Sequence, residues 1–307
     1  MAYLHSDREQ FRDAIDLAYE QAGVMVQAIE KDYYVTMLLR LLAQKMPYIV
    51  FKGGTSLSKC HKVIRRFSED IDITIDTLLS QGQKKKIKQA IVESAEELGM
   101  TIENLDETRS RRDYNRYVIA YDSVIPMASD ALKAAVLLET SYTAVSFPTV
   151  LLPVHSYIGD MMEQEAPDAI EEYNLNPFEM KVQGIDRTLA DKVFAVCDYY
   201  LQGKVAKHSR HLYDIYKLLP LVPQNENFRE LVKEVRAVRA QSAICPSALP
   251  EANVPELLEK IIREKAYKQD YDSLTMQLLE ENVPYDTVIA ALKQIADGAM
   301  FDNTYGG

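Results

Sequence analysis

Residues 51–76 hold the feature that most constrains the fold, a glycine turn followed by an alternating strand. The segment Phe51-Lys-Gly-Gly-Thr-Ser-Leu-Ser58 predicts an apolar strand that ends at two glycines and leads into a helix. The alternation in Ser68-Glu-Asp-Ile-Asp-Ile-Thr-Ile-Asp76 predicts a second strand with its isoleucines on a buried face. Because side chains two apart on a strand point the same way, Asp70 and Asp72 share the opposite face, about 6.5–7 Å apart.

These two carboxylates and the glycine turn suggest a site for a metal and a phosphate. Gly53 and Gly54 can direct successive N–H groups toward one phosphate, and the Ser56 hydroxyl can add a hydrogen bond. Like charges repel unless a cation neutralises them, so we expect Asp70 and Asp72 to bind Mg²⁺ beside a nucleoside triphosphate. Two ions are expected, and Mn²⁺ can substitute. This chemistry is nucleotidyl transfer; a plain turn and a solvated strand face are the alternatives.

A site of this kind usually needs a third carboxylate on a neighbouring strand, either for the second ion or as a base. Glu139, in the apolar segment Val136-Leu-Leu-Glu-Thr140, is the favoured candidate because a charge there is hard to place otherwise. Asp122, in Ile119-Ala-Tyr-Asp122, is the competitor, and the sequence does not separate the two.

Composition narrows the class of protein further. The 307 residues suffice for two domains, and the net charge of −11 argues against nonspecific coating of nucleic acid. A local basic patch, such as Arg109, Arg111, Arg112 and Arg116, could still attract an RNA, although a solvated face is the alternative. Three scattered cysteines, no secretory pattern and no long apolar run lead us to expect a cytoplasmic protein without membrane association.

The order of patterns predicts an α/β (α+β) fold, with a mixed sheet and flanking helices at residues 1–182 and a helical domain at 183–307. The second domain is expected to complete the active-site cleft. Predicted strands lie at 47–52, 68–76, 114–123, 132–142 and 178–182, and predicted helices at 7–45, 57–64, 82–98, 226–241, 254–266, 270–281 and 284–297, with helix also from Ile185 and a loop at 168–177.

Two charged residues of the helical half are further candidates. Lys192 lies one turn from the apolar Leu189 and Val196, so its stem can follow that surface and bring the ammonium group to phosphate charge. A surface lysine is the alternative. Asp214 is four residues after Arg210, and the plain interpretation of that spacing is an i, i+4 ion pair.

Together these segments resemble the AbiEii/AbiGii family of abortive-infection nucleotidyltransferase toxins, whose catalytic core is similar to that of DNA polymerase β. The resemblance covers nearly the whole chain. Besides the glycine turn, the motifs that carry it are Ile29-Glu-Lys-Asp-Tyr33, Phe67-Ser-Glu-Asp-Ile-Asp72, Thr188-Leu-Ala-Asp-Lys192, Arg210-His-Leu-Tyr-Asp214 and Asp270-Tyr-Asp-Ser-Leu-Thr-Met276.

The resemblance implies roles at the matching positions. Lys192 would contact the nucleotide phosphates, and Asp214 would be a base or a nucleotide contact. Asp191 departs from the glutamate common in the family, a change expected to matter little. Combined with the patterns above, the predicted catalytic residues are Asp70, Asp72, Lys192, Asp214 and Glu139; the predicted metal ligands are Asp70, Asp72 and Glu139; and the predicted nucleotide-binding residues are Gly53, Gly54, Thr55, Ser56, Ser68 and Lys192.

The resemblance also implies a biological role. The chain would be the toxin of a toxin–antitoxin pair, with its antitoxin encoded nearby. It would transfer a nucleoside monophosphate from a nucleoside triphosphate to an RNA acceptor, the tRNA 3′ end, and so block translation and growth. Because the net charge is acidic, a protein or small-molecule acceptor remains the alternative.

Overall fold

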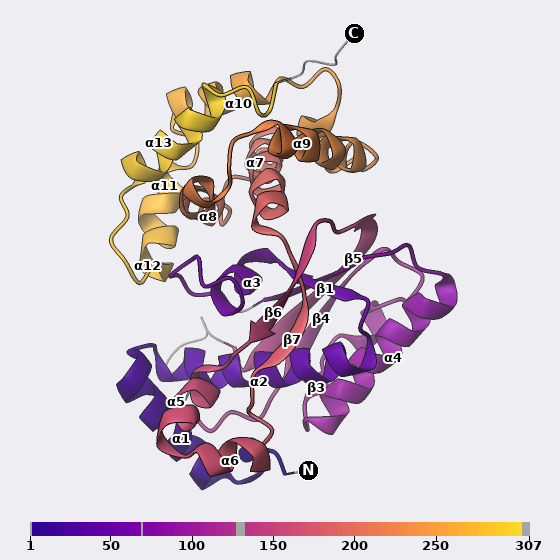
Figure 1. Cartoon of the computed structure of the whole chain (residues 1–307), viewed down its shortest axis with the longest axis vertical. Helices are drawn as coiled ribbons and strands as arrows, with labels where there is room; N and C mark the ends of the chain where they lie inside the picture. The colour runs from indigo at the N-terminus through magenta and orange to yellow at the C-terminus, as the bar shows by residue number, and fades with distance from the viewer. Residues whose placement is uncertain (1, 69, 127–132, 303–307) are drawn as a thin grey trace. The chain divides into compact units, whose positions relative to one another are not determined.

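The computed structural model describes residues 2–68, 70–126 and 133–302 (Figure 1). The chain divides into two compact units. Unit 1 contains Met1–His61 and Ser68–Gln183, and unit 2 contains Lys62–Phe67 and Gly184–Gly307. The division after Gln183 is close to the boundary expected from the sequence, but the short segment Lys62–Phe67 groups with the helical unit.

The described residues of unit 1 form a seven-stranded mixed sheet in the order β3-β4-β5-β2-β1-β7-β6. The pairs β1–β7 and β2–β5 are parallel, whereas β1–β2, β3–β4, β4–β5 and β6–β7 are antiparallel. The strands are β1 (Ile49–Lys52), β2 (Ile71–Ile75), β3 (Thr101–Ile102), β4 (Tyr114–Ala120), β5 (Ala135–Val145), β6 (Thr149–Val154) and β7 (Phe178–Gln183).

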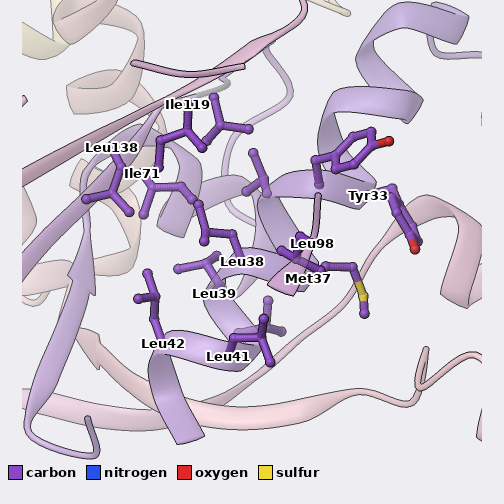
Figure 2. Packing of buried hydrophobic residues seen from close by; sticks show 14 of the residues in the cluster. Tyr33, Met37, Leu38, Leu39, Leu41, Leu42, Ile71, Leu98, Ile119 and Leu138 are labelled. Atoms are coloured by element: carbon purple, nitrogen blue, oxygen red, sulfur yellow. The ribbon is translucent and has the colours of Figure 1, made fainter. Parts of the chain in front are cut away.

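Helices α2 and α4 pack against one another and bury one face of this sheet (Figure 1). The helices of unit 1 are α1 (Arg8–Ala22), α2 (Val26–Lys45), α3 (Gly53–Lys59), α4 (Gln81–Glu97), α5 (Tyr157–Glu165) and α6 (Pro167–Glu172). Figure 2 shows Leu38 and Leu42 of α2 in the same apolar cluster as Ile71 and Leu138 of the central strands. This core holds β2 and β5 side by side. Their pairing determines which side chains lie together on the opposite face of the sheet.

Several local patterns of unit 1 match the predictions. Ile71, Ile73 and Ile75 are fully buried, as the alternation requires. Helix α4 begins at a capping box in which Ser80 and Gln83 satisfy each other's backbone N–H groups, a strong local start signal. The long helix expected at 7–45 is divided into α1 and α2 by a break after Ala22.

Unit 2 is helical, as predicted. Its helices are α7 (Ile185–Leu201), α8 (Arg210–Leu218), α9 (Glu226–Arg239), α10 (Val254–Glu264), α11 (Lys268–Asp270), α12 (Met276–Leu278) and α13 (Tyr285–Ala296). Helix α7 packs against α8, α9 and α10, and α13 packs against α8 and α10. Phe194, Tyr213, Tyr267 and Tyr271 are fully buried among them.

Two further predicted elements differ from the structure. The helix expected to reach Ile64 ends at Lys59, because the chain beyond it pairs with a distant segment: Arg66 forms a β-bridge with Leu279. The loop expected at 168–177 begins instead with helix α6, which has Pro167 in its first turn, a favourable position for proline. None of the helices in the described part of the chain is long and apolar enough to cross a membrane.

Candidate active site

The glycine turn of unit 1 is shaped around a carboxylate. Gly53 follows β1 directly and has φ of +82°, in the left-handed region that costs other residues energy. A Cβ atom at Gly53 would lie 1.9 Å from Oδ2 of Asp72. The turn therefore favours glycine for its backbone angle, and a side chain at position 53 would displace the carboxylate of Asp72.

The hydroxyl groups near the turn already have partners. The Ser56 hydroxyl is buried and donates to the carbonyl oxygen of Gly53 at 2.9 Å, so it stabilises the turn. Thr55 Oγ1 and Ser68 Oγ are 2.9 Å apart and share a hydrogen bond. This bond joins helix α3 to the segment that leads into β2.

A row of four charged residues crosses the sheet beside the turn. Asp72 on β2 is in register with Lys52 on β1 and with Glu139 on β5. Glu139 is in register with Arg116 on β4. Residues in register on adjacent strands point to the same face, with Cβ atoms about 4.5–5.5 Å apart. The structure therefore places Asp72 and Glu139 together, flanked by one cation on each side.

Asp70 and Asp72 offer carboxylate oxygens, the type of ligand that a hard divalent cation such as Mg²⁺ prefers. One oxygen of Asp70, Oδ1, is buried and has no hydrogen-bond partner within the described structure. A buried carboxylate oxygen left in this state is costly, and a cation would satisfy it. Among the described residues, no three His, Cys, Asp or Glu side chains are grouped closely enough to hold a metal by themselves.

The other aspartate of the acidic face, Asp76, is engaged differently: its carboxylate forms an ion pair with Lys181 of β7. The alternation that puts Asp70 and Asp72 on one face would also put Asp76 there, but in the structure its carboxylate is neutralised by Lys181.

The two candidates for the third carboxylate have different surroundings. Glu139 faces Arg116, with Oε1 3.8 Å from Nε, and burial together with Glu139 raises the pKa of the Tyr114 hydroxyl. Asp122 lies beyond the end of β4, is highly exposed and forms an ion pair with Arg8. Register with Asp72 thus favours Glu139.

The motif Ile29-Glu-Lys-Asp-Tyr33 contributes a residue that contacts helix α3. Asp32 on α2 forms an ion pair with Lys59 and accepts a hydrogen bond from the backbone N–H of Tyr157 at 3.1 Å. Both side chains of the ion pair are largely buried, so the contact is protected from solvent. Asp32 thereby fixes the C-terminal end of the helix that the glycine turn begins.

In unit 2, Asp214 and Lys192 lie in contact. Lys192 Nζ on α7 donates to Oδ2 of Asp214 on α8 at 2.6 Å. The Asp214 side chain is fully buried, and Arg66 donates to both of its oxygens. The i, i+4 spacing predicts Arg210 as the partner of Asp214, but Arg66 and Lys192 take that place in the structure.

These contacts set the protonation states of the cluster. Burial alone would raise the pKa of the Asp214 carboxyl, but the charges of Arg66 and Lys192 hold it well below its usual range. Burial lowers the pKa of Lys192, and Asp214 partly offsets this effect. Burial and neighbouring cations also hold the pKa of His211 well below its usual range. His211 is therefore neutral near pH 7, and Asp214 is charged.

Asp191, the residue that departs from the family pattern, forms ion pairs with Arg187 at 3.0 Å and with Arg239 at 3.1 Å. Arg239 also pairs with Asp198 at 2.7 Å. Asp191 therefore links α7 to α9, and its carboxylate is engaged within unit 2.

Three residues of these sites were not among the predicted site residues. Lys52 and Arg116 join the acidic row only through strand register, which the sequence does not encode locally. Arg66 reaches Asp214 across 148 positions of the chain. The available signals were positional: Lys52 directly precedes the glycine turn, and Arg66 stands two residues before Ser68.

The sheet and its site define a class of protein. Strand carboxylates beside a glycine turn are expected of a metal-dependent nucleotidyltransferase. The structure is similar to that of MenT4, a nucleotidyltransferase toxin from Mycobacterium tuberculosis H37Rv, with a TM-score of 0.51 and 16% identity. The match covers 92% of this chain and 88% of that chain. At this identity the similarity shows the fold, and it confirms the predicted fold class.

The sequence matches the family described as "Nucleotidyl transferase AbiEii toxin, Type IV TA system" over residues 36–292. The chain belongs to this AbiEii family and is a nucleotidyltransferase of the toxin type. The predicted family and enzyme class are thus confirmed, whereas the roles of individual residues stay predictions. No match to the chain was found among curated proteins.

Proposed function

We propose that the protein transfers a nucleoside monophosphate from a nucleoside triphosphate to the 3′ end of a tRNA, with Mg²⁺, in the cytoplasm. The observation that carries this proposal is the placement of Asp72 opposite Glu139 and against Gly53. The modified tRNA could no longer be aminoacylated, which would stop translation and growth.

Asp70 and Asp72 hold Mg²⁺ in this proposal. An ion held there would supply positive charge to the triphosphate and would lower the pKa of the acceptor hydroxyl. The 3′ oxygen of the RNA forms a bond to the α-phosphorus, the bond from that phosphorus to the bridging oxygen breaks, and pyrophosphate leaves. Glu139 is positioned to accept the hydroxyl proton or to hold a second ion.

Around these carboxylates, the chain supplies a binding surface for phosphate. Gly53 and Gly54 let the backbone approach the triphosphate closely, because neither residue carries a side chain. The bonded pair Thr55 and Ser68 fixes the turn relative to the acidic strand, and Ser56 stabilises the turn itself. Lys52 offers a positive charge on the same face as Asp72.

Lys192 of unit 2 acts in the same reaction by contacting the phosphates. Its ammonium group has three N–H donors. One of them is directed to Asp214, and the other two can bind phosphate oxygens. Asp214 positions this ammonium and is not the base, because a carboxyl whose pKa is held so low is a poor proton acceptor.

The partners in this proposal are an RNA acceptor, a nucleoside triphosphate and an antitoxin encoded nearby. Basic residues such as Arg116 offset the net charge of −11 locally, so an RNA backbone can be accommodated. Family membership supports the antitoxin, since the family is a type IV toxin–antitoxin family.

The test incubates the protein with total tRNA, Mg²⁺ and one α-labelled nucleoside triphosphate at a time. We expect labelled tRNA with the wild type and none with Asp72→Asn or Lys192→Met, while all three proteins keep the same circular dichroism spectrum. Label on protein or on a small molecule, with none on RNA, would replace the acceptor that we propose. Transfer by Asp72→Asn at the wild-type rate would show that the proposed active site is wrong.

A further inference from the structure

The guanidinium group of Arg66 binds Asp214 at both carboxylate oxygens. Nε donates to Oδ1 at 2.7 Å, and Nη2 donates to Oδ2 at 2.8 Å. Both side chains are almost completely buried. Two parallel charge-assisted hydrogen bonds of this kind fix geometry as well as charge, and a lysine cannot reproduce them.

The backbone around Arg66 is fixed to the same unit. The N–H of Arg65 donates to the hydroxyl of Tyr213 at 3.0 Å, and the N–H of Phe67 donates to the carbonyl oxygen of Leu278 at 2.9 Å. Arg66 Nη1 also donates to the carbonyl oxygen of Phe67 at 3.0 Å. The guanidinium group thus has little freedom to leave Asp214.

The charges of this cluster do not cancel. Among the described residues of the cluster, the cationic groups of Arg66 and Lys192 share the carboxylate of Asp214, and His211 is neutral near pH 7. Arg66 already neutralises Asp214 through both oxygens. The positive charge of Lys192 is therefore not neutralised within the cluster. An uncompensated charge in a buried position is costly until an anion binds.

We propose that Arg66 is a positioning residue that serves as the counter-ion of Asp214 and so leaves the ammonium group of Lys192 for an anionic phosphate of the substrate. This inference rests on the proposed function of Lys192. Without Arg66, Lys192 is the cation of the described cluster that still contacts Asp214, and its charge is no longer available to the nucleotide.

Three variants test this balance of charge. Arg66→Met should raise KM for the nucleoside triphosphate about tenfold or more, the equivalent of one lost charge-assisted contact. The double variant Arg66→Met/Asp214→Asn restores the net charge, and the Asn side-chain oxygen still accepts from Lys192, so KM should return most of the way. Arg66→Lys keeps the charge without the paired hydrogen bonds, and its KM should stay within about threefold of wild type at reduced stability.

A merely structural role predicts a different outcome. Two substitutions in a buried cluster would then lower activity further than one, and KM of the double variant would not recover. That result would overturn the proposal, as would a KM for Arg66→Met equal to that of wild type.

A readout without substrate separates this inference from the proposed function. The pKa of Lys192 can be followed by NMR in protein with labelled lysines, assigned with Lys192→Arg. Arg66→Met should raise this pKa, because a neighbouring cation is gone while Asp214 remains. An unchanged pKa would overturn the inference even if tRNA is labelled. A raised pKa together with no transfer to any RNA would support the charge balance and reject the acceptor.

Discussion

A methyl group on Gly53 would meet Oδ2 of Asp72 at 1.9 Å. The glycine turn and the acidic strand are thus built against each other, with no space for a side chain between them. A turn that merely joined a strand to a helix would not need this contact. The close approach places the backbone of the turn directly beside the carboxylate of Asp72.

Gly53→Ala should therefore abolish transfer and destabilise the protein. The left-handed backbone costs about 1–2 kcal/mol for a residue with a side chain, and Asp72 must also move from its position opposite Glu139. The free energy of unfolding from urea titrations and the transfer rate would be measured together.

The matched control is Gly99→Ala, in the same unit. Gly99 has φ of +64°, but a Cβ atom there would have no neighbour within 4 Å. We expect a similar loss of stability with transfer unchanged. If both variants lose transfer equally, backbone strain alone explains the effect and the contact with Asp72 has no special importance.

Asp70→Asn should remove the stabilisation by Mg²⁺ without weakening the metal-free protein. In the absence of metal, the substitution relieves repulsion between Asp70 and Asp72, so the melting temperature should hold or rise. At a Mg²⁺ concentration about 100 times its dissociation constant, wild type should gain about 2.7 kcal/mol, and the variant should gain almost nothing. Asp76→Asn is the control, because Asp76 is bound by Lys181 and should leave the Mg²⁺ effect intact.

Glu139→Gln should lower the transfer rate about 100-fold or more, the usual contribution of a general base or of a lost metal ligand. Stability should change by less than about 1 kcal/mol, because the contact of Glu139 with Arg116 is partly exposed. Asp122→Asn should leave the rate unchanged. The opposite pattern, with Asp122 essential and Glu139 dispensable, would show that strand register does not identify the third carboxylate.

Local patterns predicted the parts of this structure that depend on local forces. The alternation of Asp72 with buried isoleucines identified β2, and the pattern that predicted a helix at 82–98 identified α4. What the sequence could not supply were pairings between distant segments. Arg66 is directed to Asp214 because residues 65–67 pair with 278–280, so the helix expected to reach Ile64 ends early. Likewise, the choice between Glu139 and Asp122 as the third carboxylate depends on the register of β2 and β5, which places Glu139 opposite Asp72.

Asp32→Asn should destabilise unit 1 by about 3 kcal/mol, because it leaves the largely buried ammonium group of Lys59 without its counter-charge. The Asn side-chain oxygen can still accept from the N–H of Tyr157, so the loss reports the ion pair. The double variant Asp32→Asn/Lys59→Met should recover part of this stability. Additive losses in the double-mutant cycle would mean that the two residues do not stabilise α3 together.

The buried charge of Asp214 should give stability a characteristic dependence on pH. Its pKa is lowered in the folded protein, so its contribution is complete above the usual range of about 4 and is lost as pH falls toward the folded value. Asp214→Asn should therefore cost about 3–5 kcal/mol between pH 5 and 8, and the difference from wild type should shrink only in stronger acid.

Urea unfolding of both proteins at a series of pH values measures this difference. Asp272→Asn provides the control, since Asp272 pairs with Lys268 at the surface and should change stability by less than about 1 kcal/mol throughout. If the Asp214→Asn difference already shrinks near pH 6, the carboxyl of Asp214 exchanges a proton close to neutrality. It would then be a candidate base, and the assignment of Asp214 to positioning Lys192 would be wrong.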